Sequence, residues 1–260
     1  MPDDVSSRGS APRSTTGVGP VAGRDEAPTP VAGRLIIIAG ATSASGLAAA
    51  RALTGEGARV VAVGRDADKL EALATTLRRA QGPEARAIAT EVCDLTDEAA
   101  VTALAERVHG EHGSVDGILH LVGGWRGGGG LAGQTDDDYR FLERSFTALR
   151  HLTRAFDADL RASEAGRLAI VSSTAVARPL AGGANYAAVK AASEAWARAV
   201  AQGFAKDARD SGMPLRAASV IFRVKSLAGL EQTLADAFTR LWDAGADDLN
   251  DTVVTLDAEV

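Results

Sequence analysis

The stretch LIIIAGATSASG, residues 35–46, decides the fold that we expect for this chain. Its first five residues form a continuous apolar run, as a strand that is covered on both faces requires. Glycine and small residues follow, and a stretch of helix formers begins directly after Gly46. A tight turn from strand to helix directs backbone N–H groups and the positive helix end at a phosphate group. The same pattern also fits an ordinary turn, so the rest of the sequence has to decide.

Short apolar runs alternate with longer helical patterns along the rest of the chain, which predicts βαβ units in a parallel sheet. Strands are expected to begin at Leu35, Arg59, Ala85, Val115, Arg167, Leu215 and Thr252. Helices are expected near residues 46–55, 67–80, 97–110, 135–162, 184–210 and 228–244. Seven strands and six helices fit one doubly wound α/β domain with three layers, because right-handed crossovers cover both faces of the sheet.

Residues 1–33 hold five of the eight prolines, together with Ser, Thr and Gly, and no apolar stretch that could bury itself. We therefore expect a flexible tail over residues 1–33 and a single domain over residues 34–260. The tail lacks the apolar run of a secretory signal, and no later segment reaches the roughly 18 apolar residues of a membrane span. These features predict a cytoplasmic protein.

The composition narrows the function classes. The 260 residues include 28 basic and 34 acidic side chains, a formal net charge of −6. This balance disfavours binding to nucleic acid or to an anionic membrane. Cys93 is the single cysteine and cannot form an internal disulfide, and the four histidines offer no familiar zinc spacing. We expect a reducing compartment and no metal.

The end of the second expected strand, Gly64-Arg65-Asp66, bears on the cofactor of a dinucleotide fold. An acidic side chain at this strand end would accept hydrogen bonds from both ribose hydroxyls, but Gly64 occupies that place. Arg65 follows with a guanidinium suited to a 2′-phosphate, which favours NADP(H) over NAD(H). The alternative is a solvated loop arginine. Asp94, before Leu95 and after the third strand, either holds the adenine edge or caps the next helix.

Tyr186-Ala-Ala-Val-Lys190 is the sharpest chemical signal. The i, i+4 spacing puts the phenol and the ammonium on one helix face, where the positive charge is expected to lower the tyrosine pKa. Such a pair can donate and accept the proton in alcohol and carbonyl chemistry. The fifth expected strand finishes in Ser172-Ser173, so a hydroxyl stands at the carboxyl end of a parallel strand, where open α/β sheets bind ligands.

Gly40 to Gly46, Asp94, Ser173, Tyr186 and Lys190, in this order and spacing, resemble the classical short-chain dehydrogenase/reductase family over roughly residues 35–222. The resemblance implies a Rossmann-type fold, a nicotinamide cofactor and hydride exchange between an alcohol and a carbonyl. It implies that Tyr186 is the general acid/base, that Lys190 binds the nicotinamide ribose, and that Ser173 steadies the substrate oxygen. The expected cofactor-binding residues are Gly40, Thr42, Ser45, Gly46, Arg65, Asp94, Leu95, Gly123 and Lys190.

The chain also departs from the family pattern. Ala44 replaces the middle glycine of the turn, which adds a methyl group where the backbone meets the pyrophosphate. The usual Asn-Asn-Ala-Gly reads His120-Leu-Val-Gly123, and His120 either makes the hydrogen bonds of the first asparagine or is a satisfied strand histidine. Ser145 takes the place of the active-site asparagine on the long central helix and is assigned to the catalytic set. The Pro-Gly after the sixth strand reads Phe222-Arg223.

Substrate contacts are expected from the loops around this site. Residues 123–133 are rich in glycine, and Trp125 and Arg126 are the only large side chains before Leu131. This segment is either a substrate loop with an aromatic platform and an anion-binding arginine or a floppy connector. Arg178 and Phe222 are expected to border the same space.

The preferred hypothesis is an NADP(H)-dependent reductase of small carbonyl or 3-oxoacyl-like compounds. The alternative is a catalytically weak nucleotide-sensing or scaffolding protein, and a nucleic-acid-binding regulator is disfavoured by the net charge. Apolar residues on the expected helices 135–162 and 184–210 fit a subunit interface as well as the core, and the resemblance implies a homodimer or homotetramer.

Overall fold

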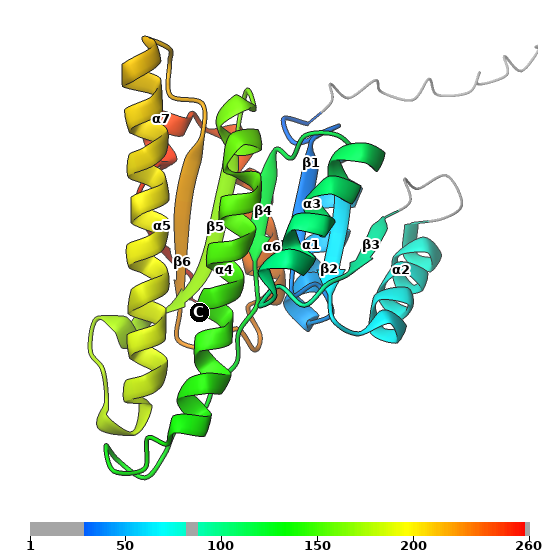
Figure 1. Ribbon diagram of the computed structural model, residues 1–260. Helices are drawn as coiled ribbons and strands as arrows, with labels where there is room; N and C mark the ends of the chain where they lie inside the picture. Colours follow the sequence, from blue (N-terminus) through cyan, green and yellow to red (C-terminus); the bar gives the residue numbers. More distant parts are fainter. Residues whose placement is uncertain (1–28, 82–87, 258–260) are drawn as a thin grey trace, which may run out of the picture.

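The computed structural model describes residues 29–81 and 88–257, and its strands form one parallel sheet in the order β3-β2-β1-β4-β5-β6-β7 (Figure 1). The strands are β1 (Leu35–Ala39), β2 (Arg59–Gly64), β3 (Ala89–Val92), β4 (Gly117–His120), β5 (Arg167–Ser173), β6 (Ala218–Val224) and β7 (Thr252–Thr255). Every neighbouring pair is parallel. The expected doubly wound sheet of seven strands is therefore confirmed. Residues 85–87 of the expected third strand lie outside the described residues.

Helices of very different lengths connect the strands. They are α1 (Ala44–Gly55), α2 (Ala67–Gln81), α3 (Glu98–Glu111), α4 (Asp136–Ala162), α5 (Ala184–Ser211), α6 (Glu231–Thr239) and α7 (Ala246–Leu249). Short 3₁₀ turns occur at η1 (Thr174–Val176), η2 (Ala181–Gly183) and η3 (Arg240–Asp243). The helix expected near residues 228–244 is shorter than predicted, because α6 ends at Thr239 and the chain tightens into η3.

Two apolar layers hold the helices against the sheet. On one face, α1, α2 and α6 pack through residues such as Leu53, Leu77 and Phe238. On the other face, α3, α4 and α5 pack through residues such as Leu104 and Phe156. Strand residues alternate between the two layers, as the two-residue period of a strand dictates. The helices therefore lie on both sides of the sheet in Figure 1, with α4 and α5 in front.

Residues 29–33, assigned to the tail from the sequence, are part of the folded structure. Residues 1–28 of the expected tail lie outside the described residues, but residues 29–33 pack against the domain. Val31 is 2% exposed within the apolar layer of α1, and the Thr29 hydroxyl donates to the carbonyl oxygen of Glu56 at 2.7 Å. Residues 29–33, which the sequence assigned to the tail, are therefore packed onto the domain through a buried valine.

The strand order places the functional edge of the sheet. The chain runs from β1 outward to β3 and then returns to β4 on the other side of β1. The loops after β1 and β4 consequently diverge, and the space between them is the crevice in which open α/β sheets bind ligands. Among residues 29–81 and 88–257, none of the helices is long and apolar enough to cross a membrane.

Candidate active site

The turn between β1 and α1 needs glycine at both of its ends. Gly40 has a φ of 82°, and a Cβ on it would lie 3.0 Å from the backbone of Leu121. A Cβ on Gly46 would lie 2.2 Å from the carbonyl oxygen of Ala41. Ser43 caps α1, since its hydroxyl accepts a hydrogen bond from the Gly46 N–H at 3.1 Å. Ala44 is exposed in the first turn of α1, so the alanine leaves this turn intact.

A cavity of ≈ 350 Å³ opens on one side of this turn. The expected cofactor residues Gly40, Thr42, Arg65, Asp94, Leu95 and Gly123 line it, together with Arg144 and Ser145. Arg65 is exposed at its rim. This cavity brings together the ends of β1, β2 and β3 with α4.

The Asp94 carboxylate interacts with two neighbouring residues, Thr96 and Arg144. It accepts hydrogen bonds from the Thr96 N–H and hydroxyl, at 3.0 and 2.7 Å, and pairs with the Arg144 guanidinium at 3.1 Å. The Thr96 bonds, with smaller contributions from Arg144 and Arg65, lower the pKa of Asp94. The cap of α3 is Asp97, whose carboxylate accepts from two backbone N–H groups of the first turn. Of the two expected roles, helix capping therefore does not belong to Asp94.

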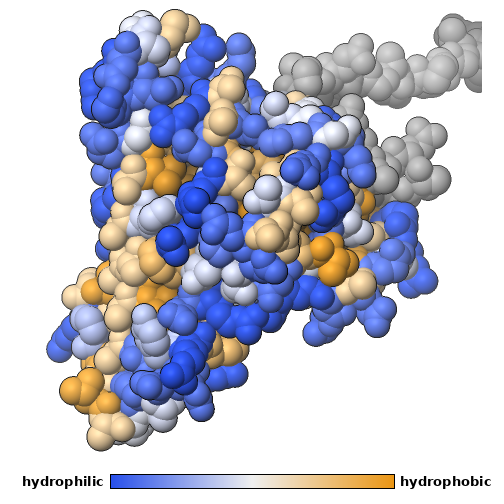
Figure 2. All heavy atoms as spheres, viewed as in Figure 1, coloured by the Kyte–Doolittle hydropathy of each residue, from blue (hydrophilic) through white to orange (hydrophobic). Residues whose placement is uncertain are grey.

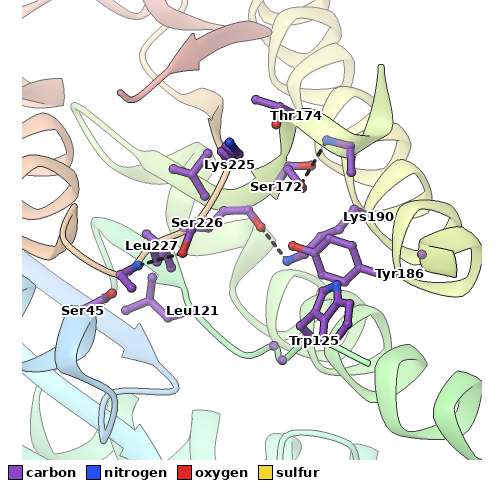
Figure 3. A pocket seen from close by; sticks show the side chains of 18 of the residues that line it. Ser45, Leu121, Trp125, Ser172, Thr174, Tyr186, Lys190, Lys225, Ser226 and Leu227 are labelled. Atoms are coloured by element: carbon purple, nitrogen blue, oxygen red, sulfur yellow. Dashed lines mark hydrogen bonds between the residues drawn. The ribbon is translucent and has the colours of Figure 1, made fainter. Parts of the chain in front are cut away.

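A larger cavity of ≈ 1110 Å³ lies on the other side of the turn. It brings together the predicted residues Ser45, Gly123, Trp125, Ser173, Arg178, Tyr186 and Lys190, with His120 at its floor. Ser43, Leu121, Val122 and Gly123 line both cavities, so the two form one cleft over the carboxyl ends of β1, β4 and β5. Figure 3 shows the rings of Tyr186 and Trp125 on one side of the larger cavity, across from Leu227 and Leu121.

Tyr186 and Lys190 lie on the cavity face of α5, one helical turn apart. The Lys190 ammonium donates to the carbonyl oxygen of Val171 at 2.8 Å and lies 5.8 Å from the centre of the Tyr186 ring. Burial lowers the pKa of Lys190 to about 8, although the nearby Glu194 carboxylate opposes this shift. Burial also raises the pKa of Tyr186, and the hydrogen bond with Ser173 only partly offsets it.

The direction of the Tyr186 shift corrects the expectation that Lys190 lowers the tyrosine pKa. Loss of water around the phenol disfavours the phenolate more than Ser173 favours it. The Lys190 ammonium is directed at Val171 rather than at the phenol oxygen. At neutral pH Tyr186 therefore holds its proton, which is the state of a proton donor.

Glu194 continues the same face of α5 by one more turn and was not predicted from the sequence. Its side chain is 4% exposed, and its carboxylate accepts hydrogen bonds from the Ser172 hydroxyl at 2.7 Å and from Arg223 Nε at 2.8 Å. Arg223, which the sequence placed at the family's glycine after the sixth strand, lies within β6. Its ion pair with Glu194 is partly buried, and the Glu194 carboxylate raises the pKa of Lys190.

His120 makes one hydrogen bond and has one buried nitrogen without a partner among the described residues. The imidazole is 5% exposed, and Nε2 donates to the carbonyl oxygen of Ser145 at 3.1 Å. A carbonyl only accepts, so Nε2 carries the proton and Nδ1 is an acceptor. Nδ1 has no hydrogen-bond partner among the described residues. Burial, with the charge of Lys190, lowers the pKa of His120 to about 3, so the ring is neutral at physiological pH.

Ser145 does not direct its hydroxyl at Lys190, as its assignment to the catalytic set implied. Its hydroxyl donates to the carbonyl oxygen of Leu142 at 2.7 Å, one turn earlier in α4. Its own carbonyl is held by His120. The physical reason is that a buried serine in a helix satisfies its hydroxyl most easily on the preceding turn. Ser145 therefore contacts the site through its backbone carbonyl, which binds His120, and not through its hydroxyl.

Two of the four expected substrate residues lie elsewhere. The Arg126 guanidinium stacks over the Phe141 ring at 4.0 Å and does not line the larger cavity. Phe222 is 1% exposed in the apolar layer with Phe238, because β6 continues through Val224. The cavity wall after β6 is instead formed by residues 225–228. Leu180, which follows Arg178 in the loop expected at this border, lines the cavity, whereas Lys225 was missed because nothing in its local sequence distinguishes it from other loop residues.

Metal ligands do not gather in the described part of the chain, where no group of three or more His, Cys, Asp or Glu side chains could hold an ion. His109 Nε2 lies 2.7 Å from an oxygen of the Asp159 carboxylate, so the imidazole of His109 pairs with an acidic side chain. Cys93 is buried, and burial raises the pKa of its thiol.

A parallel sheet with a phosphate-type turn, a cleft at its switch point and a Ser-Tyr-Lys set defines a nucleotide-binding α/β protein with proton-transfer chemistry. The family model of short chain dehydrogenases matches residues 34–208, and the chain belongs to this family. This confirms the resemblance seen in the sequence.

Similar proteins include dehydrogenases and a complex with NADP. A 2,3-dihydro-2,3-dihydroxybenzoate dehydrogenase of Bacillus subtilis is 28% identical over 163 residues, 62% of this chain and 60% of that relative. A D-threitol dehydrogenase of Mycolicibacterium smegmatis is 37% identical over 91 residues, 35% of this chain and 34% of that relative. Both matches thus span less than two thirds of the relative's length. The crystal structure of a metagenomic short-chain oxidoreductase in complex with NADP has a TM-score of 0.74 and 26% identity, covering 89% of this chain and 100% of that one.

Proposed function

We propose that this protein is an NADP(H)-dependent oxidoreductase that interconverts a small carbonyl compound and its alcohol. The observation that carries the proposal is the meeting of Ser173, Tyr186 and Lys190 in one cavity, which is continuous with a cleft over the glycine turn. Family membership and the NADP complex of a similar oxidoreductase support the same conclusion.

The residues present fit a dinucleotide. Gly40 and Gly46 let the turn pack closely at the N-terminus of α1, since a Cβ on either glycine would meet backbone. That end of the helix suits a pyrophosphate. In the smaller cavity Arg65 would bind a 2′-phosphate, and Asp94 with Leu95 would border the adenine. In the larger cavity Lys190 would bind the nicotinamide ribose, and the bound cofactor would supply or accept the hydride.

The mechanism follows from the protonation states of the site. Tyr186 holds its proton because burial raises its pKa, so its phenol donates that proton to the substrate oxygen in the direction of reduction. Ser173 hydrogen-bonds the same oxygen as negative charge develops on it. Lys190 contributes a positive charge near the phenol while it remains protonated, and the neutral His120 lines the same cavity.

The walls of the larger cavity indicate the kind of substrate. Trp125 and Leu180 are 61% and 72% exposed at its mouth, so a bound molecule would cover apolar surface there. Arg178 and Lys225 are the basic side chains of this rim. We propose a small carbonyl or 3-oxoacyl-like compound with an apolar body. A cytoplasmic location and a homodimer or homotetramer complete the proposal.

The first experiment titrates the protein with NADPH and NADH by fluorescence, in the wild type and in Arg65→Ala. A lost charge-assisted contact to the 2′-phosphate should weaken NADPH binding by roughly tenfold to a hundredfold and leave NADH binding nearly unchanged. Arg209→Ala, an exposed arginine at the end of α5, is the matched control and should bind both nucleotides like the wild type. Equal weakening of both nucleotides in Arg65→Ala would contradict the phosphate role.

The second experiment screens carbonyl compounds for NADPH oxidation, with Tyr186→Phe as the control. The variant keeps the ring but loses the proton donor, so turnover should fall by 10²-fold or more while NADPH still binds. Nucleotide binding without turnover of any carbonyl by the wild type would favour the sensing or scaffolding alternative. Failure to bind either nucleotide would exclude both proposals.

A further inference from the structure

Two loops meet beside the larger cavity. The segment 121–135 follows β4 and the segment 174–183 follows β5, and both extend beyond the sheet at the lower end of Figure 1. The Gly128 N–H donates to the carbonyl oxygen of Gly182 at 2.7 Å. A Cβ on Gly127 would lie 2.4 Å from the same oxygen, so the two backbones touch only because residue 127 has no side chain. The glycine-rich segment 123–133 is therefore held in place by backbone contacts with the loop after β5, and we call it the glycine-rich wall of the cavity.

The side chain of Gln134 joins these loops to a third segment. Its Nε2 group lies within hydrogen-bond distance of three carbonyl oxygens, those of Gly128 at 3.1 Å, Gly130 at 3.3 Å and Gly182 at 3.0 Å. Its Oε1 oxygen accepts a hydrogen bond from the Asn185 N–H at 3.2 Å. One half-buried amide thus contacts the loop after β4, the loop after β5 and the first turn of α5.

The first turn of α5 needs this contact. Its N-cap residue is Gly183, which has no side chain to cap the helix, and its first turn contains no acidic residue. The free N–H groups at a helix start require acceptors, and a cap contributes to holding the helix start in place. Gln134 supplies one such acceptor from 51 residues away, at the residue directly before Tyr186. Asn185 returns a bond, since its amide donates to the carbonyl oxygen of Thr135 at 3.2 Å.

We propose that Gln134 is a positioning residue that couples the glycine-rich wall to the first turn of α5, so that wall order and Tyr186 placement depend on each other. The wall carries Trp125, which faces the same cavity as Tyr186 (Figure 3). A substrate that packs against Trp125 therefore also tightens the start of the helix that carries the proton donor. The catalytic half of this inference rests on the proposed function, whereas the structural coupling does not.

Two substitutions separate the donor and acceptor roles of the amide. Gln134→Ala removes both. Gln134→Glu keeps an oxygen that can accept from the Asn185 N–H, but it loses the donors and brings a carboxylate close to three carbonyl oxygens. Gln202→Ala, at an exposed glutamine on α5, is the matched control. Comparable melting temperatures of all variants would establish that they fold.

Amide hydrogen exchange reads out the coupling directly. In Gln134→Ala, exchange should rise about tenfold or more both at 127–133 and at 184–187, as the loss of a hydrogen bond worth ~1.4 kcal/mol predicts. In Gln134→Glu, exchange should rise at 127–133 while 184–187 stays closer to the wild type. Unchanged exchange at 184–187 in Gln134→Ala would overturn the proposal.

Kinetics test the consequence for Tyr186. With any carbonyl compound that the wild type reduces, Gln134→Ala should lower kcat about tenfold while the Kd for NADPH changes less than twofold. The same loss in kcat and in NADPH binding would indicate general damage and contradict a positioning role. If the wild type reduces no carbonyl, the proposed function fails, but the exchange experiment still decides the coupling.

Discussion

At the scale of single residues, His120 differs most from what its sequence context indicates. It is neither an asparagine-like residue with both polar atoms satisfied nor a fully satisfied strand histidine. Nε2 donates to the Ser145 carbonyl, whereas Nδ1 is buried without a partner among the described residues. A buried acceptor without a partner costs about 1–3 kcal/mol, so this histidine lowers the stability of the strand core in which it lies.

The titration of His120 predicts a pH dependence of stability. Its pKa falls from 6.5 to about 3 on folding, so between these pH values the unfolded chain binds one proton more than the folded protein. The free energy of unfolding should therefore decrease as pH falls below 6.5, by up to about 1.4 kcal/mol per pH unit. In His120→Asn the denaturant-derived free energy should decline less steeply between pH 6.5 and 4. His109→Asn, at the surface beside Asp159, controls for the loss of one histidine, and equal slopes in His120→Asn and the wild type would refute the prediction.

At the scale of elements, α5 arranges the chemistry. Tyr186, Lys190 and Glu194 follow one another at four-residue spacing, so one face of the helix carries a phenol, an ammonium and a carboxylate. The carboxylate is held in turn by Ser172 of β5 and Arg223 of β6. Residues of β5 and β6 thus hold in place the Glu194 carboxylate that raises the pKa of Lys190. They thereby influence the pH range in which the Lys190 ammonium is protonated.

The charge of Lys190 predicts the pH profile of the reaction. Its pKa of about 8 means that kcat/KM for reduction should fall as pH rises through that value, because the ammonium is lost. Glu194→Gln removes the carboxylate that raises this pKa, so the decline should begin at lower pH. The glutamine can still accept the Ser172 hydrogen bond, which limits structural damage.

The matched control is Glu231→Gln, which removes the carboxylate that lines the larger cavity from α6. Its profile should follow that of the wild type. The role of Glu194 would be excluded if Glu194→Gln lost activity over the same pH range as the wild type while it still bound NADPH.

At the scale of the whole molecule, the outer face of α5 offers a surface for self-association. Ala188, Ala191, Ala195 and Ala199 are exposed along this helix, and Figure 2 shows a pale apolar strip where α5 runs in Figure 1. Phe146 of α4 and Trp196 of α5 are half-buried beside it, with ring centres 6.1 Å apart. Two copies packed through such a face would cover these residues, as closed symmetric dimers do.

Light scattering after size-exclusion chromatography tests this expectation. The wild type should have at least twice the mass of one chain, and Ala195→Arg should shift the distribution toward the single chain, because a long charged side chain would enter the interface. Ala72→Arg places the same change on an exposed alanine of α2 and should leave the mass unchanged. A wild type with the mass of one chain would refute the interface.

The sequence alone determined what depends on short-range periodicity. Apolar runs and helical spacing located the strands and most helices, the glycines of residues 35–46 defined the first turn, and the four-residue spacing placed Tyr186 and Lys190 on one face. These inferences hold because the helix repeat and the steric limits of a tight turn are local properties of the chain. The packing of residues 29–33 was not predicted, because a turn held by one buried valine has no period.

Only the tertiary structure decided which distant groups meet. Arg223 lies 29 residues from the Glu194 that it pairs with, and Gln134 lies 48 residues from the Gly182 carbonyl that it binds. The inward turn of Phe222 and the stacking of Arg126 on Phe141 likewise follow from where strands end and helices pack. Such contacts depend on how whole strands and helices align and on how deeply each side chain is buried. Neither property can be inferred from the neighbouring residues in the sequence.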